Sequence, residues 1–180
     1  MIRNLEDEQL TEIYQKYMIS DFPENELKSL AMIRNNIRSK ECNAYGYFED
    51  DLLLGYATVL IAEKILILDY FAILPDHRQK GYGLKFLNEL FDHLKDYEAL
   101  LIEAEVPEDE ITERRIRFYH RAGCKDSGLC GRLYFVDYCL LYKDLSIVHT
   151  SKDIEEAIYQ TYHLVYPQFE NTKYLQFYRN

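Results

Sequence analysis

The spacing of hydrophobic residues changes near the middle of the chain. Residues 65–74 form an almost unbroken apolar run in which Asp69 is the only charged position, and such a run predicts a strand that is covered on both faces. From Gly83 to Leu94 the apolar residues recur every three or four positions, which predicts an amphipathic helix. A buried strand is therefore expected to lead into a helix through the short segment between them.

The remaining pattern predicts further strands and helices on both sides of this pair. Alternating positions and apolar runs mark strands, and apolar residues three or four positions apart mark helices. This order predicts an α/β protein whose sheet is mixed and mostly antiparallel, with helices on both faces. We expect, in order, a strand at 1–5, helices at 10–18 and 23–37, strands at 43–48 and 52–62, then, after the central pair, a strand at 99–106, a helix at 111–122, a hairpin at 125–132, a strand at 133–143 and a helix at 151–165.

Length and composition fit one globular domain. The chain has 180 residues, of which 48% are hydrophobic and 29% charged, and this is enough to bury a sizeable core. We take residues 1–145 as the main domain and residues 146–180 as a C-terminal helical extension packed on it. The N-terminal residues lack the apolar core of a signal peptide, so we expect a cytoplasmic protein.

Charge and cysteine content narrow the classes of partner. A formal net charge of −10 disfavours binding to nucleic acid or to an anionic membrane, and it is compatible with a cationic ligand. The four cysteines show neither Cys-x-x-Cys pairing nor histidines at zinc-ligand spacing. We therefore expect reduced thiols and no metal site.

The segment between the central strand and its helix has the chemistry of an anion site. It reads Arg78-Gln-Lys80-Gly81-Tyr-Gly83. The first turn of a helix has backbone N–H groups without intrahelical partners and a partial positive charge, so phosphate binds well there. Glycine lets the backbone approach phosphate oxygens and permits positive φ. Because the chain as a whole is acidic, this local excess of positive charge indicates a specific anion.

Two other glycine motifs are excluded by their own requirements. A dinucleotide-binding fingerprint needs a small residue three positions after the second glycine, where this chain has Phe86. The phosphate loop of nucleoside triphosphatases needs Gly-Lys-Ser/Thr at the helix start, and the segment does not contain it. The pattern that remains is Arg-x-x-Gly-x-Gly.

This pattern resembles the most specific motif of the GNAT superfamily of acetyl-CoA-dependent N-acetyltransferases, Arg/Gln-x-x-Gly-x-Gly/Ala between the fourth strand and the next helix. The superfamily's second element reads Asn-x-x-Ala-x-x-Phe-Tyr-x-x-x-Gly-Phe. The resemblance covers residues 1–145 and implies the GNAT fold, in which splayed central strands receive the pantetheine arm. In this chain Phe118, Tyr119 and Gly123 match the second element, and Thr112, Arg115 and Cys124 depart from it.

The resemblance also implies where acetyl-CoA binds and where coenzyme A remains as product. The pantetheine arm would contact the backbone of Phe71, Ala72 and Ile73, where an N–H would polarise the thioester oxygen. Thr112 stands where the family's usual Asn contacts that arm. The pyrophosphate would lie over the turn and the helix start, formed by Arg78, Gln79, Lys80, Gly81, Tyr82, Gly83 and Leu84.

Tyr119 is the candidate general acid. In families that share the second element, the helical tyrosine faces the thioester sulfur, and a positioned proton donor accelerates such a step by roughly 10² to 10⁴. The alternative is a buried tyrosine that completes the core between helix and sheet.

Three carboxylates are candidates for the general base: Glu103, Glu105 and Asp69. A carboxylate accepts the proton of the attacking amine directly or through water, and it also attracts the ammonium form. Asp69 is included because an acid inside an apolar strand is costly to bury unless it is used or paired. The alternative for each is a structural ion pair with Arg114, Arg115 or Arg117.

The acceptor pocket is expected beside the first helix-to-helix loop and the late hairpin, with Asp21, Phe22, Glu24, Tyr134 and Tyr138 as candidate residues. Acidic residues on this side predict direct acetyl transfer to a primary amine of a cationic small molecule. Two alternatives stay open: a protein or peptide N-acetyltransferase with an open groove, and a non-catalytic acyl-CoA-binding or regulatory module. We expect a monomer or homodimer.

Overall fold

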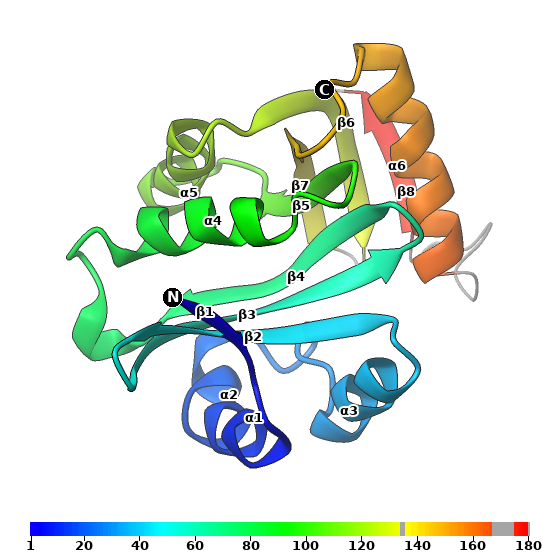
Figure 1. Ribbon diagram of the computed structural model, residues 1–180. Helices are drawn as coiled ribbons and strands as arrows, with labels where there is room; N and C mark the ends of the chain where they lie inside the picture. Colours follow the sequence, from blue (N-terminus) through cyan, green and yellow to red (C-terminus); the bar gives the residue numbers. More distant parts are fainter. Residues whose placement is uncertain (134–135, 167–174, 180) are drawn as a thin grey trace. The chain divides into compact units, whose positions relative to one another are not determined.

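The computed structural model describes residues 1–133, 136–166 and 175–179, and these residues form an α/β protein with eight strands (Figure 1). The strands are β1 (Ile2–Asn4), β2 (Cys42–Glu49), β3 (Leu52–Ala62), β4 (Ile65–Ile73), β5 (Ala99–Glu105), β6 (Lys125–Leu133), β7 (Val136–Asp144) and β8 (Leu175–Arg179). The helices are α1 (Asp7–Ile13), α2 (Ile19–Asp21), α3 (Leu30–Arg38), α4 (Tyr82–His93), α5 (Glu110–Arg121) and α6 (Ser151–Val165), with a π-helical turn η1 (Tyr14–Met18) and a 3₁₀ turn η2 (Pro75–His77).

The strands follow the order β1-β2-β3-β4-β5-β7-β6-β8. The pairs β1–β2, β2–β3, β5–β7, β6–β7 and β6–β8 are antiparallel, which confirms the predicted α/β class and the mostly antiparallel sheet. The chain divides into two compact units: an N-terminal unit of residues 1–61 and 68–90, and a C-terminal unit of residues 62–67 and 91–180. No helix in the described part of the chain is long and apolar enough to cross a membrane.

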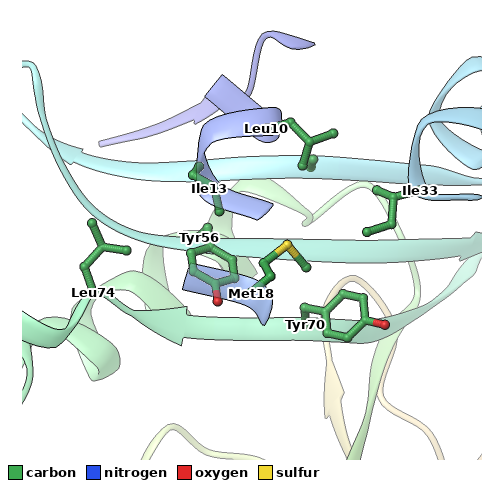
Figure 2. Close-up of a cluster of buried hydrophobic side chains, with 8 residues drawn as sticks. Leu10, Ile13, Met18, Ile33, Tyr56, Tyr70 and Leu74 are labelled. Atoms are coloured by element: carbon green, nitrogen blue, oxygen red, sulfur yellow. The ribbon is translucent and has the colours of Figure 1, made fainter. Parts of the chain in front are cut away.

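In the N-terminal unit, helices cover both faces of the sheet. One face carries the side chain of Tyr70, and the helices before β2 pack against it (Figures 1 and 2). Phe71, the next residue of β4, points to the opposite face, where its ring lies 5.0 Å from that of Phe86 in α4. The cluster on the first face comprises Leu10, Ile13, Met18, Ile33, Ala44, Tyr56, Tyr70 and Leu74 (Figure 2).

The first two predicted helices differ from the observed ones. The expected helix at 10–18 is part of a longer segment in which α1, η1 and α2 follow one another from Asp7 to Asp21. The helix predicted at 23–37 is present as α3, but its predicted start at Pro23 is wrong. The helix begins at Leu30, where Ser29 caps it by accepting a hydrogen bond from the N–H of Met32. The residues before that cap form a loop.

The C-terminal unit carries α6 over one face of its strands. Residues directly opposite each other in antiparallel strands lie on the same face of a sheet. Glu105 is paired with Tyr138, Tyr138 with Gly131, and Gly131 with Phe177 of β8. The ring of Phe177 meets that of Tyr162 in α6 at 5.0 Å, so α6 covers this face.

The segment predicted as a hairpin, 125–132, is instead strand β6, and the strand expected from Leu133 begins at Val136 as β7. Gly128 explains the error. Its φ of +80° lies where the register with β7 shifts between Asp126 and Cys130, so this glycine makes a bulge inside a strand and not a turn between strands. The C-terminal extension contains the predicted helix 151–165, and it also contains strand β8, which was not predicted.

Candidate active site

The turn between β4 and α4 has a backbone that favours glycine. After the 3₁₀ turn η2, Gln79 has a φ of 62° and Gly81 a φ of 82°. A Cβ on Gly81 would meet nothing within 4 Å, so this position needs glycine for its conformation and not for space. Gln79 adopts the left-handed region in spite of its side chain, which stores some strain in the turn.

The start of α4 offers hydrogen-bond donors to an anion. The N–H of Lys85 is the first to bond back within the helix, to the carbonyl of Gly81 at 3.4 Å, so the preceding N–H groups have no intrahelical acceptor. The side chains of Lys80 and Lys85 are exposed beside them. Lys80 Nζ donates to the carbonyl of Asp76 at 2.7 Å. The turn therefore fits a phosphate group through its backbone and its local charge.

Arg78 links two segments of the N-terminal unit. Its Nε donates to the carbonyl of Ile73 at 2.8 Å, and its Nη2 lies 2.6 Å from Oδ1 of Asp21. Oδ2 of Asp21 accepts a hydrogen bond from the hydroxyl of Tyr56 at 2.8 Å. Burial, then this hydrogen bond, raises the pKa of Tyr56 well above its usual range. Asp21, expected to face the acceptor, is thus joined to the candidate phosphate turn.

The end of β4 is more accessible than its start. Residues 65–68 are buried, whereas Phe71, Ala72 and Ile73 are half-buried. A Cβ on Gly55 of β3 would lie 2.7 Å from the carbonyl oxygen of Ala72 and 2.8 Å from Cδ1 of Ile73. Glycine at this position lets β3 approach the segment expected to bind pantetheine.

Asp69 is held in an ion pair that the sequence did not suggest. Its Oδ1 lies 2.5 Å from Nζ of Lys28, with side-chain exposures of 8% and 19% for the two residues, and the hydroxyl of Thr58 lies 3.4 Å from Oδ2. The expectation of pairing was therefore sound for Asp69, but the partner is a lysine from the loop before α3 and not one of the predicted arginines.

The loop that carries Lys28 is fixed to β4 through Tyr70. The Tyr70 hydroxyl donates to the carbonyl of Glu26 and accepts from the N–H of Lys28, both at 2.8 Å. The ring of Phe22 meets the Tyr70 ring edge-on at 4.8 Å. Glu24 is exposed at the outer turn of the loop. Of the acceptor residues expected here, Phe22 is packed and Glu24 faces solvent.

Tyr119 in the C-terminal unit is 8% exposed on α5. Burial raises its pKa to about 12, while the charge of Arg115 lowers it to a smaller extent. Within the described residues no group hydrogen-bonds with its hydroxyl, and no buried side-chain oxygen or nitrogen there lacks a partner. The hydroxyl oxygen therefore keeps contact with solvent, and it stays protonated at neutral pH.

The two glutamates of β5 have different partners. Glu105 forms an ion pair with Arg115 at 3.0 Å, as one of the sequence-based alternatives proposed. Glu103 accepts a hydrogen bond at Oε1 from the hydroxyl of Tyr162 at 2.5 Å. Asp69 and Glu105 thus each form an ion pair with a basic side chain, and Glu103 hydrogen-bonds with a phenol.

The last predicted site residues lie around α5 and β7. The hydroxyl of Thr112 takes part in the N-terminal cap of α5, where it donates to Oδ1 of Asp109 at 2.8 Å and accepts from the N–H of Glu108 at 3.0 Å. Tyr138 is half-buried on β7. Tyr134 lies outside the described residues. The cap gives Thr112 a structural role that its place in the motif did not predict.

The sequence also matches a known family. The acetyltransferase (GNAT) family profile matches residues 3–124, which include both motifs, the turn at Gly81 and the buried Tyr119. The chain belongs to the acetyltransferase (GNAT) family. It is an acyltransferase, and the resemblance noted from its motifs is confirmed.

Solved structures of GNAT proteins share this fold. One described as a GNAT-family acetyltransferase from Bacteroides thetaiotaomicron aligns with a TM-score of 0.77 and 24% identity, covering 92% of this chain and 98% of that one. The ribosomal-protein-S18-alanine N-acetyltransferase of Escherichia coli gives 0.65 and 18%, covering 83% and 96%. Spermidine N-acetyltransferase from Vibrio cholerae, in complex with CoA and spermine, gives 0.63 and 15%, covering 81% and 95%. None of the curated proteins is a significant match.

Four residues of this GNAT protein were missed by sequence reasoning: Tyr56, Lys28, Gly55 and Tyr162. Each acts through a partner distant in sequence, so no local spacing marks it. A weak signal existed for Lys28 alone, because a buried acid such as Asp69 requires a cation or donor somewhere in the chain. The GNAT motifs identify the candidate phosphate turn and Tyr119. They do not identify these supporting contacts.

Proposed function

We propose that this GNAT protein transfers the acetyl group of acetyl-CoA directly to a primary amine of a cationic small molecule, with Tyr119 as general acid and Glu103 as the carboxylate that serves the amine. The observation that carries the acetyl-CoA assignment is the start of α4, where Gly81 at a φ of 82° precedes backbone N–H groups without intrahelical acceptors. When bound, acetyl-CoA supplies an acetyl group activated as a thioester.

The residues present fit the diphosphate part of that molecule. The N–H groups at the start of α4 and the exposed side chains of Lys80 and Lys85 are the groups that would hold it. Arg78 would act indirectly, because its guanidinium already binds Asp21 and the carbonyl of Ile73. In this assignment Arg78 shapes the turn, and the backbone binds the phosphate oxygens.

Tyr119 has the properties of a proton donor for a leaving thiolate. A phenol with a pKa near 12 is protonated at neutral pH, and its oxygen has no partner among the described residues. A thiolate that leaves during acyl transfer gains a proton from such a group. This role is proposed from the motif, the raised pKa and the accessible hydroxyl together.

The case for a cationic acceptor rests on the formal net charge of −10 and on the carboxylates of the expected acceptor side. Three of these carboxylates form ion pairs: Asp21 with Arg78, Asp69 with Lys28 and Glu105 with Arg115. The ion pairs weaken the negative potential that was expected from the sequence. Glu103 accepts a hydrogen bond from the hydroxyl of Tyr162. Such a carboxylate attracts an ammonium ion and accepts a proton from the amine.

Release of free thiol from acetyl-CoA tests the proposal. The acceptor panel contains spermidine, 1,3-diaminopropane, an aminoglycoside, glutamate and a peptide with a free N-terminus. We expect the cationic amines to react faster than glutamate, with a difference that shrinks as ionic strength rises. We also expect CoA to raise the unfolding free energy by about 2.7 kcal/mol at 100 times its Kd.

Each other outcome rejects a defined part of the proposal. Faster reaction with glutamate at low salt contradicts the cationic acceptor, and reaction with the peptide alone favours a protein N-acetyltransferase. Stabilisation by CoA without acetylation of any acceptor favours a binding or regulatory module. No stabilisation by CoA or acetyl-CoA removes the basis of the assignment.

A further inference from the structure

Two cysteines lie directly opposite each other in the antiparallel pair of β6 and β7. Cys130 of β6 is paired with Cys139 of β7, and their thiols hydrogen-bond with each other. Both cysteines are free thiols. They follow residue 124, where the match to the family ends, and the proposed function uses neither of them.

The backbone places these two cysteines within the range of a disulfide. Residues directly opposite each other in antiparallel strands have Cα atoms about 4.5 or 5.5 Å apart, depending on whether they exchange hydrogen bonds. Disulfides join Cα atoms that are about 4.4 to 6.8 Å apart, so either spacing fits. Opposite side chains also point to the same face of the sheet. A bond between the two sulfur atoms therefore needs no change in the register of the strands.

Cys124 lies in the same unit, but it is too far from Cys139 to compete for this bond. Its neighbour Lys125 is opposite Tyr142 of β7, and Tyr142 is three residues from Cys139, or about 10 Å along the strand. Cysteines whose Cα atoms are more than about 7 Å apart cannot be bridged without movement of the backbone. The strand register thus favours one pairing in the C-terminal unit.

The two opposite thiols differ in their access to solvent. Cys130 is 2% exposed, whereas Cys139 is half-buried. The residue opposite Cys139 in β5 is Ala104, so β5 places no large side chain beside this sulfur. Burial, and after it the neighbouring Cys130, raises the pKa of Cys139 to about 11, so its oxidation is slow at neutral pH. Cys139 is therefore the sulfur that meets an oxidant, and Cys130 is placed to complete the bond.

We propose that Cys130 and Cys139 are a modification site, at which a low-molecular-weight disulfide such as glutathione disulfide produces a reversible bond between β6 and β7. The thiolate of Cys139 attacks one sulfur of the reagent, whose S–S bond breaks and releases a glutathione thiolate. Cys130 then loses its proton, attacks Sγ of Cys139 and displaces the second glutathione. The two protein thiols lose two electrons, and one glutathione disulfide is reduced to two molecules of glutathione. This inference is independent of acetyl transfer.

The bond should stabilise the folded chain, because the two strands are already paired. It would act mainly on the unfolded state, in which it closes the short loop of residues 130–139. For a loop of this length we expect the unfolding temperature to rise by about 5 to 10 °C. The rise should disappear when dithiothreitol reduces the bond.

Peptide mapping of the native protein tests the pairing, because trypsin separates all four cysteines. Cleavage after lysine and arginine places Cys130 in peptide 126–132 and Cys139 in peptide 133–143, whereas Cys124 and Cys42 fall in peptides 122–125 and 41–64. The wild type is incubated with glutathione disulfide at about pH 8.5, where more thiolate is present. The remaining thiols are blocked with N-ethylmaleimide in denaturant, and the digest is analysed by mass spectrometry without reductant.

We expect peptides 126–132 and 133–143 to become linked at least about 10-fold faster than any pair that includes Cys124 or Cys42, because only the opposite cysteines are within bonding range. Cys139→Ala should abolish both the link and the rise in unfolding temperature. Cys124→Ala is the matched control and should retain both, because Cys124 is also a buried thiol whose pKa burial raises to about 12.

Three results overturn the inference. Free thiols at both positions after treatment, or a lasting mixed disulfide of glutathione with Cys139, show that the pair does not close. Faster links through Cys124 or Cys42, or between two molecules on a non-reducing gel, show that the strand register does not direct oxidation. An unfolding temperature that stays level or falls in the oxidised wild type shows that the strands must distort to form the bond.

Discussion

Gly81 and Gly128 have nearly the same backbone conformation in different surroundings. Their φ values are +82° and +80°, and at both positions a Cβ would meet nothing within 4 Å. A side chain is therefore strained by conformation to a similar degree at each, about 1 to 2 kcal/mol. Gly81 lies in the candidate phosphate turn, and Gly128 lies in the bulge of β6. The same substitution at both glycines therefore distinguishes a loss of stability from a loss of CoA binding.

We predict that Gly81→Asp abolishes binding of CoA, because it places a negative charge at the helix start, and that Gly128→Asp loses similar stability and keeps CoA binding. Unfolding temperatures with and without CoA give both quantities. Equal loss of the CoA-induced shift in the two variants would show that strain, and not the phosphate site, governs binding.

We predict that the hydroxyl group of Tyr119 is needed for normal turnover. Tyr119→Phe should lower kcat by roughly 10² to 10⁴ and leave the Kd for acetyl-CoA unchanged, because only the proton donor is lost. The control is Tyr47→Phe, which removes another hydroxyl whose pKa is raised to about 12 by burial. Turnover at the wild-type level in Tyr119→Phe would show that Tyr119 is a structural core residue and not the general acid.

Between elements, Asp21 joins the end of α2 to the turn after β4 and to β3. It binds Arg78 on one side and the hydroxyl of Tyr56 on the other, and Tyr56 is 1% exposed. Asp21→Ala leaves that buried hydroxyl without its acceptor, so we predict a loss of about 1 to 3 kcal/mol in unfolding free energy. Adding Tyr56→Phe should recover part of it, as measured by urea denaturation. Additive losses in the double variant would contradict this coupling.

The elements that sequence predicted well are those whose pattern is local. β3 and α6 were placed at their observed bounds, Leu52–Ala62 and Ser151–Val165, because apolar periodicity and flanking polar residues determine both. The start of the second helix was misplaced at Pro23 because the cap at Ser29 and the bonds of Tyr70 to the loop compete with helical propensity. The bulge at Gly128 was missed because a positive φ inside a strand resembles a turn in sequence.

The candidate site was predictable to the extent that it lies in motifs. The turn at Gly81 was located from its position between strand and helix, and Tyr119 from the resemblance to the second GNAT element, whereas the ion pairs of Asp21 and Asp69 were not located. The two residues of these pairs are 57 and 41 positions apart in sequence, respectively. Such contacts follow from the folded chain, and no local rule states them.

For the whole molecule, the buried phenols and thiols predict sensitivity to alkali. Burial raises the pKa of Tyr70 and Tyr119 from 10.0, and of Cys42 and Cys124 from 9.0, to about 12. The folded state therefore holds these protons more tightly than the unfolded state. The associated stability is complete below the unfolded pKa values and is lost as pH rises from about 9 toward 12.

Unfolding free energies measured across that range should fall steadily, and Tyr119→Phe should flatten the profile by about 2 to 3 kcal/mol near pH 12. A conservative control is Tyr159→Phe, whose exposed ring should leave the slope as it is. A profile that stays level up to pH 12 would mean that these groups are hydrated in solution.

Strand β8 has a consequence for where this acetyltransferase can be cut. It pairs with β6 from Leu129 to Leu133, and it belongs to the extension that follows residue 145. A fragment that stops at residue 145 keeps both GNAT motifs and loses β8, the strand that pairs with β6 on this side. The fragment ending at 145 would leave a row of unpaired N–H and C=O groups on β6, open to the same edge of another molecule. A fragment that ends with the family match at residue 124 would lack β6 and β7 as well and leave β5 without its antiparallel partner β7, so we expect chains shortened to either residue to aggregate.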